Sequence, residues 1–306
     1  MSYGQYTTSA DVMDLLSADV ARLEALLERT LDGLTSPSGL HQAYRHALFS
    51  GGKRVRPALA LLSCEAVGGE RSWGDAAGAS VEMIHAFSLV HDDLPALDDD
   101  DMRRGKPTVH RAHGEAMAIL AGDGLLTHAF TLLCNEGGGR GDAALAGTLC
   151  GELARATGKM IDGQVLDTLG GDTAPMPDEA RLIAIHRNKT GALITGACRM
   201  GALAGMWGGV EESKLDSVTR YGNAMGLMFQ AVDDLLDVES TPEALGKATQ
   251  KDDDAGKLTY PRIFGLRETR RRISELRAES LSAIEPLGPA GEPLASLCLT
   301  MAERVS

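Results

Sequence analysis

The sequence of 306 residues predicts an all-α protein. Aromatic residues make up only 4% of the chain, whereas β-sheets are enriched in aromatic and β-branched side chains. Alanine and leucine, which have high helix propensity, recur throughout. Apolar residues follow helical spacing over most of the chain, and strand and helix patterns do not alternate. We therefore expect about ten helices or more in a single domain over residues 1–306.

The first expected helix covers residues 11–31, where apolar side chains recur every three or four positions. A second covers residues 39–49. Pro57 opens the third, because a proline needs no backbone N–H in the first helical turn. Residues 74–94 form a long buried helix that ends near Pro95. Glycine and proline clusters then predict loops at residues 137–139, 170–171, 175–177, 208–209 and 286–293.

Charge and segment composition restrict the partners and the compartment. The formal net charge is −13, which repels phosphate backbones and makes nucleic acid a poor partner. The five cysteines form no CxxC pair and lie in apolar or small-residue runs, so we expect buried, reduced thiols. We find no signal-peptide pattern and no long uncharged apolar run, and we expect a cytoplasmic protein without a membrane span.

A first acidic motif lies at residues 92–101, directly after an apolar helical run. Carboxylates at a helix C-terminus oppose the helix dipole and repel one another. A divalent cation with oxygen ligands would offset that cost, although a solvated helix end is the simpler alternative. A calcium-binding loop is disfavoured, because alternating ligands and a central glycine are absent. The six carboxylates are Asp92, Asp93, Asp98, Asp99, Asp100 and Asp101, of which we expect the last three to be plain surface.

A second acidic motif, residues 233–237, interrupts the apolar run FQAVDDLLD. Asp233 and Asp237 are four residues apart and share one face of a helix. Carboxylates in a buried run are rare unless they are paired or bound to metal. One such motif is weak evidence, but two that each follow an apolar helix together predict a metal site.

Basic residues near these motifs could bind a diphosphate. The turn GGKRVRP at residues 51–57 combines flexible backbone with three cations, although it lacks the spacing of a P-loop. Five further residues carry cations beside the acidic motifs or in polar stretches: Arg103, Arg104, Lys189 (before Thr190), Lys247 and Lys257. Each alone would be an ordinary surface residue or turn, but together they describe one anion and metal site. We expect the arginine-rich run at residues 267–277 to be a solvated helix face.

These segments resemble the trans-prenyltransferases, the polyprenyl diphosphate synthases. The matching stretches are GGKRVRP, HDDLPALDDDDMRRGKPTVH, NKTGALI, FQAVDDLLD and GKATQKDDDAGKLTYP, in that order. The long first motif is most similar to that of the bacterial farnesyl diphosphate synthases, the geranyltranstransferases. The resemblance implies an isoprenoid synthase fold, a helical bundle around a central cavity, in a homodimer. It also implies condensation of isopentenyl diphosphate with dimethylallyl or geranyl diphosphate to farnesyl diphosphate, by magnesium-assisted ionisation of the allylic diphosphate.

The resemblance further implies roles for individual residues. Three Mg²⁺ ions are expected, two on Asp92 and Asp98 and a third on Asp233. The expected catalytic set is Asp92, Asp93, Asp98, Arg103, Lys189, Thr190, Gln230, Asp233 and Lys247. Within it Arg103, Lys189 and Lys247 contact the allylic diphosphate with Lys257 nearby, and Thr190 and Gln230 place oxygen dipoles near the carbocation. The isopentenyl diphosphate set is Gly52, Lys53, Arg56, His85 and Arg104.

Product length depends on the helix before the first acidic motif. Phe87 lies five residues before Asp92, or about 7.5 Å along a helix, where its ring could floor the pocket while the small Ser88 leaves room. We therefore expect a fifteen-carbon product, although Phe87 could equally be ordinary core. The alternatives are a twenty-carbon synthase, a terpene cyclase, or a silent partner subunit. The isopentenyl diphosphate residues disfavour a cyclase, and two intact acidic motifs disfavour a silent subunit. The basic tail of many relatives is reduced here to Arg304.

Overall fold

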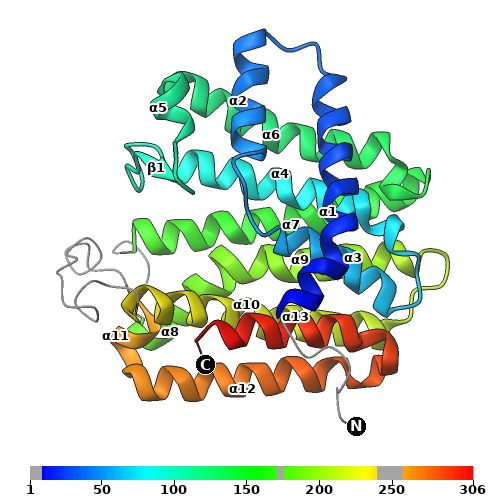
Figure 1. The fold of residues 1–306 in the computed structure, drawn as a ribbon, viewed down its shortest axis with the longest axis vertical. Helices are drawn as coiled ribbons and strands as arrows, with labels where there is room; N and C mark the ends of the chain where they lie inside the picture. Colours follow the sequence, from blue (N-terminus) through cyan, green and yellow to red (C-terminus); the bar gives the residue numbers. More distant parts are fainter. Residues whose placement is uncertain (1–8, 171–175, 240–257, 306) are drawn as a thin grey trace. The chain divides into compact units, whose positions relative to one another are not determined.

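The computed structural model describes residues 9–170, 176–239 and 258–305, and it confirms the all-α fold (Figure 1). The long helices are α1 (Ser9–Asp32), α2 (Ser38–Leu48), α3 (Val55–Ala66), α4 (Asp75–Asp92), α6 (Glu115–Asn135), α7 (Ala143–Thr168), α9 (Ala192–Gly205), α10 (Glu212–Glu239), α12 (Leu266–Ile284) and α13 (Glu292–Ala302). Short helices are α5 (Val109–His113), α8 (Asp178–Ile185) and α11 (Tyr260–Phe264). Lys247 and Lys257 lie outside the described residues.

The described residues form two compact units, which we treat separately. The first unit contains residues 14–154 and 199–210, and the second contains residues 155–198, 211–306 and the start of the chain. Helices α7 and α9 run from one unit into the other. The organisation of residues 1–306 as a single functional domain stays a prediction.

Helix α4 forms the core of the first unit. Twelve of its residues are buried, and it packs against α3 and most extensively against α6. Small residues allow this close packing: a Cβ at Gly122 of α6 would lie 2.1 Å from Nε2 of His91. Each fully buried aliphatic side chain, such as Met83 or Ile84, contributes about 1.5–3 kcal/mol to stability. This packing holds the C-terminal end of α4, where the first acidic motif begins.

Helix α10 has the same place in the second unit, where it packs against α12. Its buried Tyr221 donates a hydrogen bond to the Leu294 carbonyl at 2.8 Å. At Gly226 a Cβ would lie 2.6 Å from the Cα of Gly191, so α10 closely approaches the turn at residues 186–191. Glycine at these two positions therefore brings the backbone beside Thr190 against α10.

Three local expectations differ from the structure. Residues 286–293 are not a plain loop, because a 3₁₀ turn (Glu285–Gly291) leads into α13, where Pro293 occupies the first turn. A small antiparallel hairpin, β1 (Met102–Arg103) and β2 (Lys106–Pro107), was not predicted. The expectation of buried cysteines is right for Cys64, Cys198 and Cys298 but wrong for the exposed Cys134 and the half-buried Cys150.

Helix α6 is long and apolar enough to cross a membrane by length and composition alone. Its mean hydropathy reaches 1.5 over 18 residues, of which 39% are buried. One such helix is weak evidence for a span, since core helices of water-soluble proteins pass the same test.

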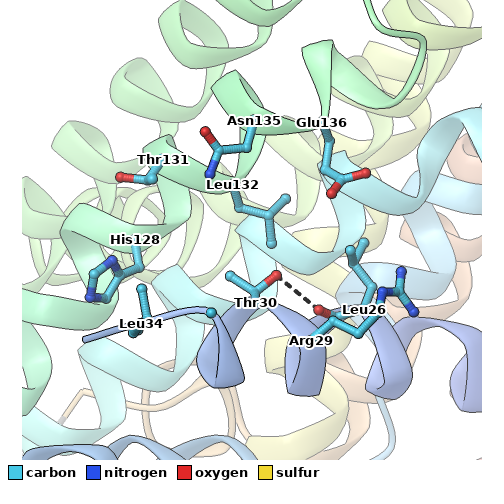
Figure 2. A pocket seen from close by; sticks show the side chains of 10 residues that line it. Leu26, Arg29, Thr30, Leu34, His128, Thr131, Leu132, Asn135 and Glu136 are labelled. Atoms are coloured by element: carbon cyan, nitrogen blue, oxygen red, sulfur yellow. Dashed lines mark hydrogen bonds between the residues drawn. The ribbon is translucent and has the colours of Figure 1, made fainter. Parts of the chain in front are cut away.

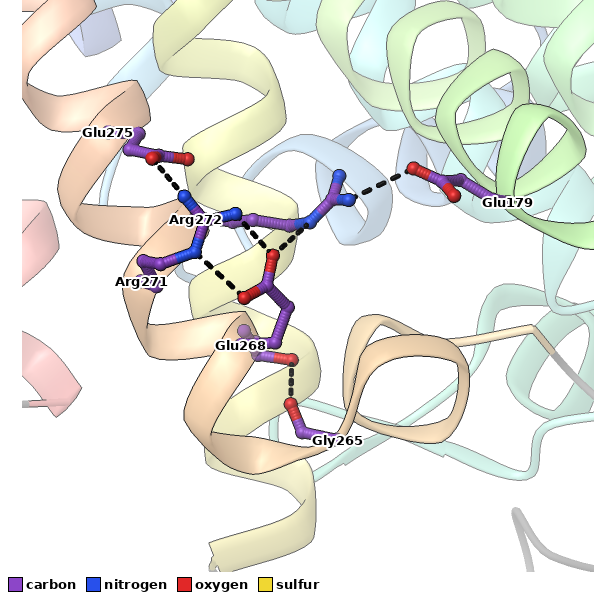
Figure 3. A network of polar contacts seen from close by, with 7 residues as sticks. Glu179, Gly265, Glu268, Arg271, Arg272 and Glu275 are labelled. Atoms are coloured by element: carbon purple, nitrogen blue, oxygen red, sulfur yellow. Dashed lines mark hydrogen bonds and ion pairs between the residues drawn. The ribbon is translucent and has the colours of Figure 1, made fainter.

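The arginine-rich run lies on α12 and forms a charged network at its surface (Figure 3). Glu268 accepts hydrogen bonds from both Arg271 and Arg272, and Arg272 also donates to Glu179 on α8 at 2.9 Å. The side chains of Arg271 and Glu275 are more than half exposed, so such pairs add little stability. The prediction of a solvated face is confirmed.

Candidate active site

The turn between α2 and α3 brings several predicted isopentenyl diphosphate residues together. Gly51 and Gly52 have φ values of 96° and 136°, which only glycine adopts readily. The Arg104 guanidinium lies against this turn and donates a hydrogen bond to the Gly51 carbonyl. A Cβ at Gly52 would lie 2.6 Å from Nη1 of Arg104, so glycine is required for this approach. The turn and the hairpin cation therefore form one surface of backbone and positive charge.

Arg56 and His85 form the second contact of this group. Nη1 of Arg56 lies 3.3 Å from Nε2 of His85, and the arginine must be the donor. Burial lowers the pKa of His85 well below its usual value, and the charges of Arg56 and Arg104 lower it further. The imidazole is therefore neutral at pH 7. Lys53 is exposed in the same turn.

The hairpin that carries Arg103 and Arg104 is anchored by histidines. Nε2 of His46 donates to the Pro107 carbonyl at 2.9 Å, which leaves Nδ1 to accept from Nε2 of His113 at 3.1 Å. Burial lowers the pKa of His46, so this imidazole is neutral at pH 7. A small cavity of about 30 Å³ lies beside this anchor, lined among others by His46, Arg103 and Arg104.

The first acidic motif closes on itself after α4. The amide of Asp98 donates to the carbonyl of Asp92 at 2.9 Å, and the amide of Asp100 donates to the carbonyl of Asp93 at 3.2 Å. The chain therefore returns to the helix end, so that residues 92 and 98 are adjacent in space although six positions apart. Asp92 is half-buried and Asp98 is exposed.

Asp93 differs from its neighbour, because it is only 3% exposed. Its Oδ1 accepts a hydrogen bond from Nε of Arg103 at 2.7 Å. Burial raises the pKa of Asp93, and the Arg103 guanidinium opposes that rise. Arg103, expected to bind the allylic diphosphate, is thus oriented by a buried carboxylate.

In the second unit a π-helical turn (His186–Gly191) presents Lys189 and Thr190. Such turns occur frequently at functional sites. A Cβ at Gly163 of α7 would lie 2.1 Å from the Lys189 amide nitrogen, so α7 packs tightly on this turn. Nζ of Lys189 donates to Oδ2 of Asp167 at 2.6 Å. Asp167 was not predicted as a site residue, and no spacing in the sequence singled it out.

A chain of hydrogen bonds joins the turn to the second acidic motif. Thr190 Oγ1 donates to Gln230 Oε1 at 2.9 Å, and Gln230 Nε2 donates to Asp234 Oδ1 at 2.9 Å. Asp234 Oδ2 accepts the backbone amide of Tyr260 at 2.9 Å. Burial raises the pKa of Asp234 to about 6, against these hydrogen bonds. Asp234 was also not predicted as a site residue. Its position three residues after the buried Ala231 places it on the buried face of α10, and this spacing could have indicated it.

Asp233 is half-buried and faces the C-terminus of the chain. Its Oδ1 lies 3.0 Å from Nη1 of Arg304, in the last turn of the described residues. Arg304 thus contacts a predicted metal ligand, which the sequence did not indicate.

The predicted metal ligands fit Mg²⁺ by their chemistry. Among the described residues no three or more acidic, histidine or cysteine side chains gather as a metal cluster. Mg²⁺ does not need such a cage, since it commonly uses one or two carboxylates, substrate phosphates and water. Asp92 and Asp98, brought together by the closed turn, offer hard oxygen ligands of this kind.

The residues expected to set product length lie on α4 of the first unit, which also contains a separate cavity. Phe87 is 7% exposed and packs edge-on against His91 at 5.4 Å, while Ser88 donates to the His85 carbonyl. A cavity of about 210 Å³ lies between α1 and α6, with Leu26 and Leu132 beside Arg29 and His128 (Figure 2). None of the predicted site residues lines this cavity.

Comparisons with known proteins agree with this arrangement. The family model described as polyprenyl synthetase matches residues 37–285. Geranylgeranyl pyrophosphate synthase 11, chloroplastic, of Arabidopsis thaliana is 44% identical over 252 residues, covering 81% of this chain and 69% of that protein. A chloroplastic geranylgeranyl pyrophosphate synthase of Capsicum annuum is 43% identical, covering 81% and 67%.

Solved structures are similar over almost the whole chain. A geranyltransferase from Legionella pneumophila has a TM-score of 0.83 and 31% identity, covering 97% of this chain and 99% of that one. An FPP/GFPP synthase from Zymomonas mobilis has a TM-score of 0.81 and 31% identity, covering 95% and 98%. The isoprenoid synthase fold is therefore confirmed. Because the family match also spans well over half of its residues, this chain belongs to the polyprenyl synthetase family of trans-prenyltransferases.

Proposed function

We propose that this protein extends an allylic diphosphate with isopentenyl diphosphate and that its main product is the twenty-carbon geranylgeranyl diphosphate. The observation that carries the proposal is the grouping of cations and a neutral imidazole around the glycine turn, Arg56 on His85 and Arg104 on Gly51. Together with the exposed Lys53, these side chains present cations and N–H donors of the kind that bind a diphosphate.

The choice of twenty carbons rests on the relatives. Proteins that are 40–44% identical to this chain are named geranylgeranyl pyrophosphate synthases. They support the twenty-carbon alternative better than the fifteen-carbon product expected from Phe87. A farnesyl diphosphate synthase remains the second candidate, favoured by the buried aromatic ring of Phe87 on α4.

In the proposed reaction the chain's own residues bind and orient the substrates. Asp92, Asp98 and Asp233 are assigned to three Mg²⁺ ions. When bound, the metal supplies Lewis-acid neutralisation of the departing diphosphate. Arg103 and Lys189 add charge at fixed positions, since Arg103 is held by Asp93 and Asp100 and Lys189 is held by Asp167.

The oxygen dipoles of Thr190 and Gln230 are assigned to the carbocation. The Thr190 hydroxyl donates its hydrogen bond to Gln230 Oε1, so its own lone pairs remain for a positive charge. An apolar surrounding would protect the cation from water. Lys247 and Lys257 complete the proposed allylic diphosphate site.

One assay tests the proposal and separates the candidates. The protein is incubated with Mg²⁺, isopentenyl diphosphate, and dimethylallyl, geranyl or farnesyl diphosphate in turn, and the products are identified by chromatography. Elongation of farnesyl diphosphate to twenty carbons supports the proposal, and accumulation of fifteen carbons with all primers supports the second candidate. Cyclised products without isopentenyl diphosphate would indicate a terpene cyclase, and no turnover would indicate a silent subunit.

Variants of α4 sharpen the product test. Phe87→Ala should shift products longer if the ring floors the pocket, and Ser88→Phe should shift them shorter. An unchanged distribution in both variants would show that Phe87 only packs against His91 in the core.

We also propose a homodimer in the cytoplasm. The dimer is supported by the exposed apolar surface of α6, where Ile119 is 45% and Leu120 is 56% exposed. A relative from Arabidopsis thaliana is named the large subunit of a heterodimeric synthase, so a different partner is an alternative. Light scattering should give a dimer mass for the isolated chain and a monomer for Leu120→Glu.

A further inference from the structure

In the glycine turn, Arg54 lies between Lys53 and Arg56, which are both assigned to isopentenyl diphosphate, yet the proposed function leaves Arg54 without a role. The side chain of Arg54 is 3% exposed, whereas Lys53 is exposed and Arg56 is half-buried. An arginine is almost never fully buried unless it is paired. The three cations of the turn are therefore not equivalent, and the middle one points into the first unit.

The guanidinium of Arg54 connects three helices. Nη1 donates to Oε1 of Glu82 on α4 at 2.6 Å, and Nη2 donates to the Leu48 carbonyl at the end of α2 at 2.7 Å. Nη2 also lies 3.2 Å from Oε1 of Glu24 on α1. The side chain of Glu82 is 5% exposed and that of Glu24 is 45% exposed, so Glu82 is the buried partner.

The backbone at Arg54 is left-handed, with φ 50° and ψ 36°, directly before α3 begins. A residue with a Cβ pays about 1–2 kcal/mol for that conformation. The buried ion pair supplies a reason why the chain keeps it, because moving Arg54 would leave Glu82 charged and unpaired in the interior.

The Arg54–Glu82 ion pair lies on the same face of α4 as His85 of the isopentenyl diphosphate set. Glu82 and His85 are three residues apart on α4 and so share one face of the helix. Arg54 binds the first of them and Arg56 contacts the second, so the turn meets α4 at two successive positions. Fixing the first contact fixes the distance and orientation of the second.

We propose that Arg54 is a positioning residue, whose buried ion pair with Glu82 holds the glycine turn on α4 and so aligns Arg56, His85 and Lys53 for isopentenyl diphosphate. This inference rests on the proposed function, because it presumes that these residues bind that substrate. It predicts that breaking the pair harms one substrate and spares the other.

The decisive variant is Glu82→Gln, which keeps the size and a hydrogen-bond acceptor but removes the charge. Its matched control is Glu24→Gln, which removes the exposed partner of the same guanidinium. We expect Glu82→Gln to raise the KM for isopentenyl diphosphate by about tenfold, with kcat and the KM of the allylic primer changed less than about twofold. Glu24→Gln should change all three by less than about twofold.

A second variant and a binding measurement guard against simple unfolding. Arg54→Lys keeps a charge for Glu82 but loses the planar fork, and it should raise the same KM by about threefold. Calorimetry with isopentenyl diphosphate in the absence of Mg²⁺ should show the same order of weakening. Equal rises for both substrates, or an unchanged KM in a folded Glu82→Gln protein, would overturn the positioning role. Failure of the wild-type protein to bind isopentenyl diphosphate at all would instead overturn the proposed function.

Discussion

Each of the two acidic motifs contains adjacent aspartates, and in both pairs one carboxylate points outward and the next points inward. Asp92 and Asp233 are half-buried, whereas Asp93 is 3% and Asp234 is 5% exposed. The inward carboxylates differ in what holds them. Asp93 is paired with the guanidinium of Arg103, and Asp234 accepts neutral N–H groups from Gln230 and Tyr260.

This contrast suggests that the buried carboxylate of each pair anchors its segment, whereas the half-buried one is available as a candidate ligand for a cation. An inward carboxylate fixes its segment, by a charge at the first motif and by dipoles at the second. The weaker compensation at the second motif agrees with the pKa of Asp234, which burial raises to about 6. The outward carboxylates Asp92 and Asp233 are the ones that the proposed function assigns to Mg²⁺.

The largest expected effect concerns the outward pair. Asp92→Ala and Asp233→Ala should each lower turnover by about 10²–10³-fold, because the charge of the departing diphosphate loses stabilisation. Steady-state kinetics over a range of Mg²⁺ concentrations measures the loss, and circular dichroism should show an intact fold. Turnover near wild type in either variant would remove that residue from the metal site.

The pH dependence of stability should report on the buried contact between His186 and Asp234. Nε2 of His186 lies 3.8 Å from Oδ2 of Asp234, and burial lowers the pKa of His186 to about 4. A lowered histidine pKa means that the unfolded chain binds the proton first, so stability is lost as pH falls from about 6.5 towards 4. Asp234 has the opposite sign, since its raised pKa favours the folded state as pH falls through the same range.

The comparison with His186→Leu isolates the histidine contribution. As pH falls from about 6.5 to 4, the unfolding free energy of His186→Leu should rise relative to that of the wild-type protein, by on the order of 3 kcal/mol. Urea denaturation of both proteins at several pH values measures it. A constant difference would show that His186 is not buried as a neutral group.

Removing an inward carboxylate should cost stability, and at Asp93 it should also disturb the Arg103 guanidinium that this carboxylate orients. Asp93→Ala leaves Arg103 with only the longer contact to Asp100, and Asp234→Ala leaves two N–H donors unsatisfied, so each should lose about 2 kcal/mol. The control is Asp162→Ala on the exposed face of α7, which should stay within about 0.5 kcal/mol of wild type. Wild-type midpoints for Asp93→Ala or Asp234→Ala in denaturant would contradict the anchoring role.

The smallest effect concerns Arg304 on Asp233. Because this cation occupies a predicted metal ligand, Arg304→Ala should lower the Mg²⁺ concentration for half-maximal binding by about two- to fivefold, as expected for a partly exposed ion pair. Calorimetric titration with Mg²⁺ measures this directly. Arg267→Ala, which removes an exposed arginine of α12, is the control. Weaker Mg²⁺ binding in Arg304→Ala would instead indicate that the arginine supports the loaded site.

The amino-acid sequence by itself was enough to place the helices and to predict the candidate residues of the site. Helical periodicity is a local property, and it placed the second helix at residues 39–49 and the fourth at 74–94, close to the observed α2 and α4. Residue types and spacing also indicated both acidic motifs and the cations of the glycine turn, since hard carboxylate ligands and phosphate-binding cations are recognisable without coordinates.

Only the tertiary structure decided which of several similar neighbours is buried and which partner each one contacts. Asp92 and Asp93 are alike in sequence, as are Arg54 and Arg56. In the structure, Asp93 is buried against Arg103 of the hairpin and Arg54 is buried against Glu82 of α4. The Lys189–Asp167 and Arg304–Asp233 contacts join residues far apart in the chain. Side-chain direction depends on packing between helices, and that packing is set by the whole fold rather than by local spacing.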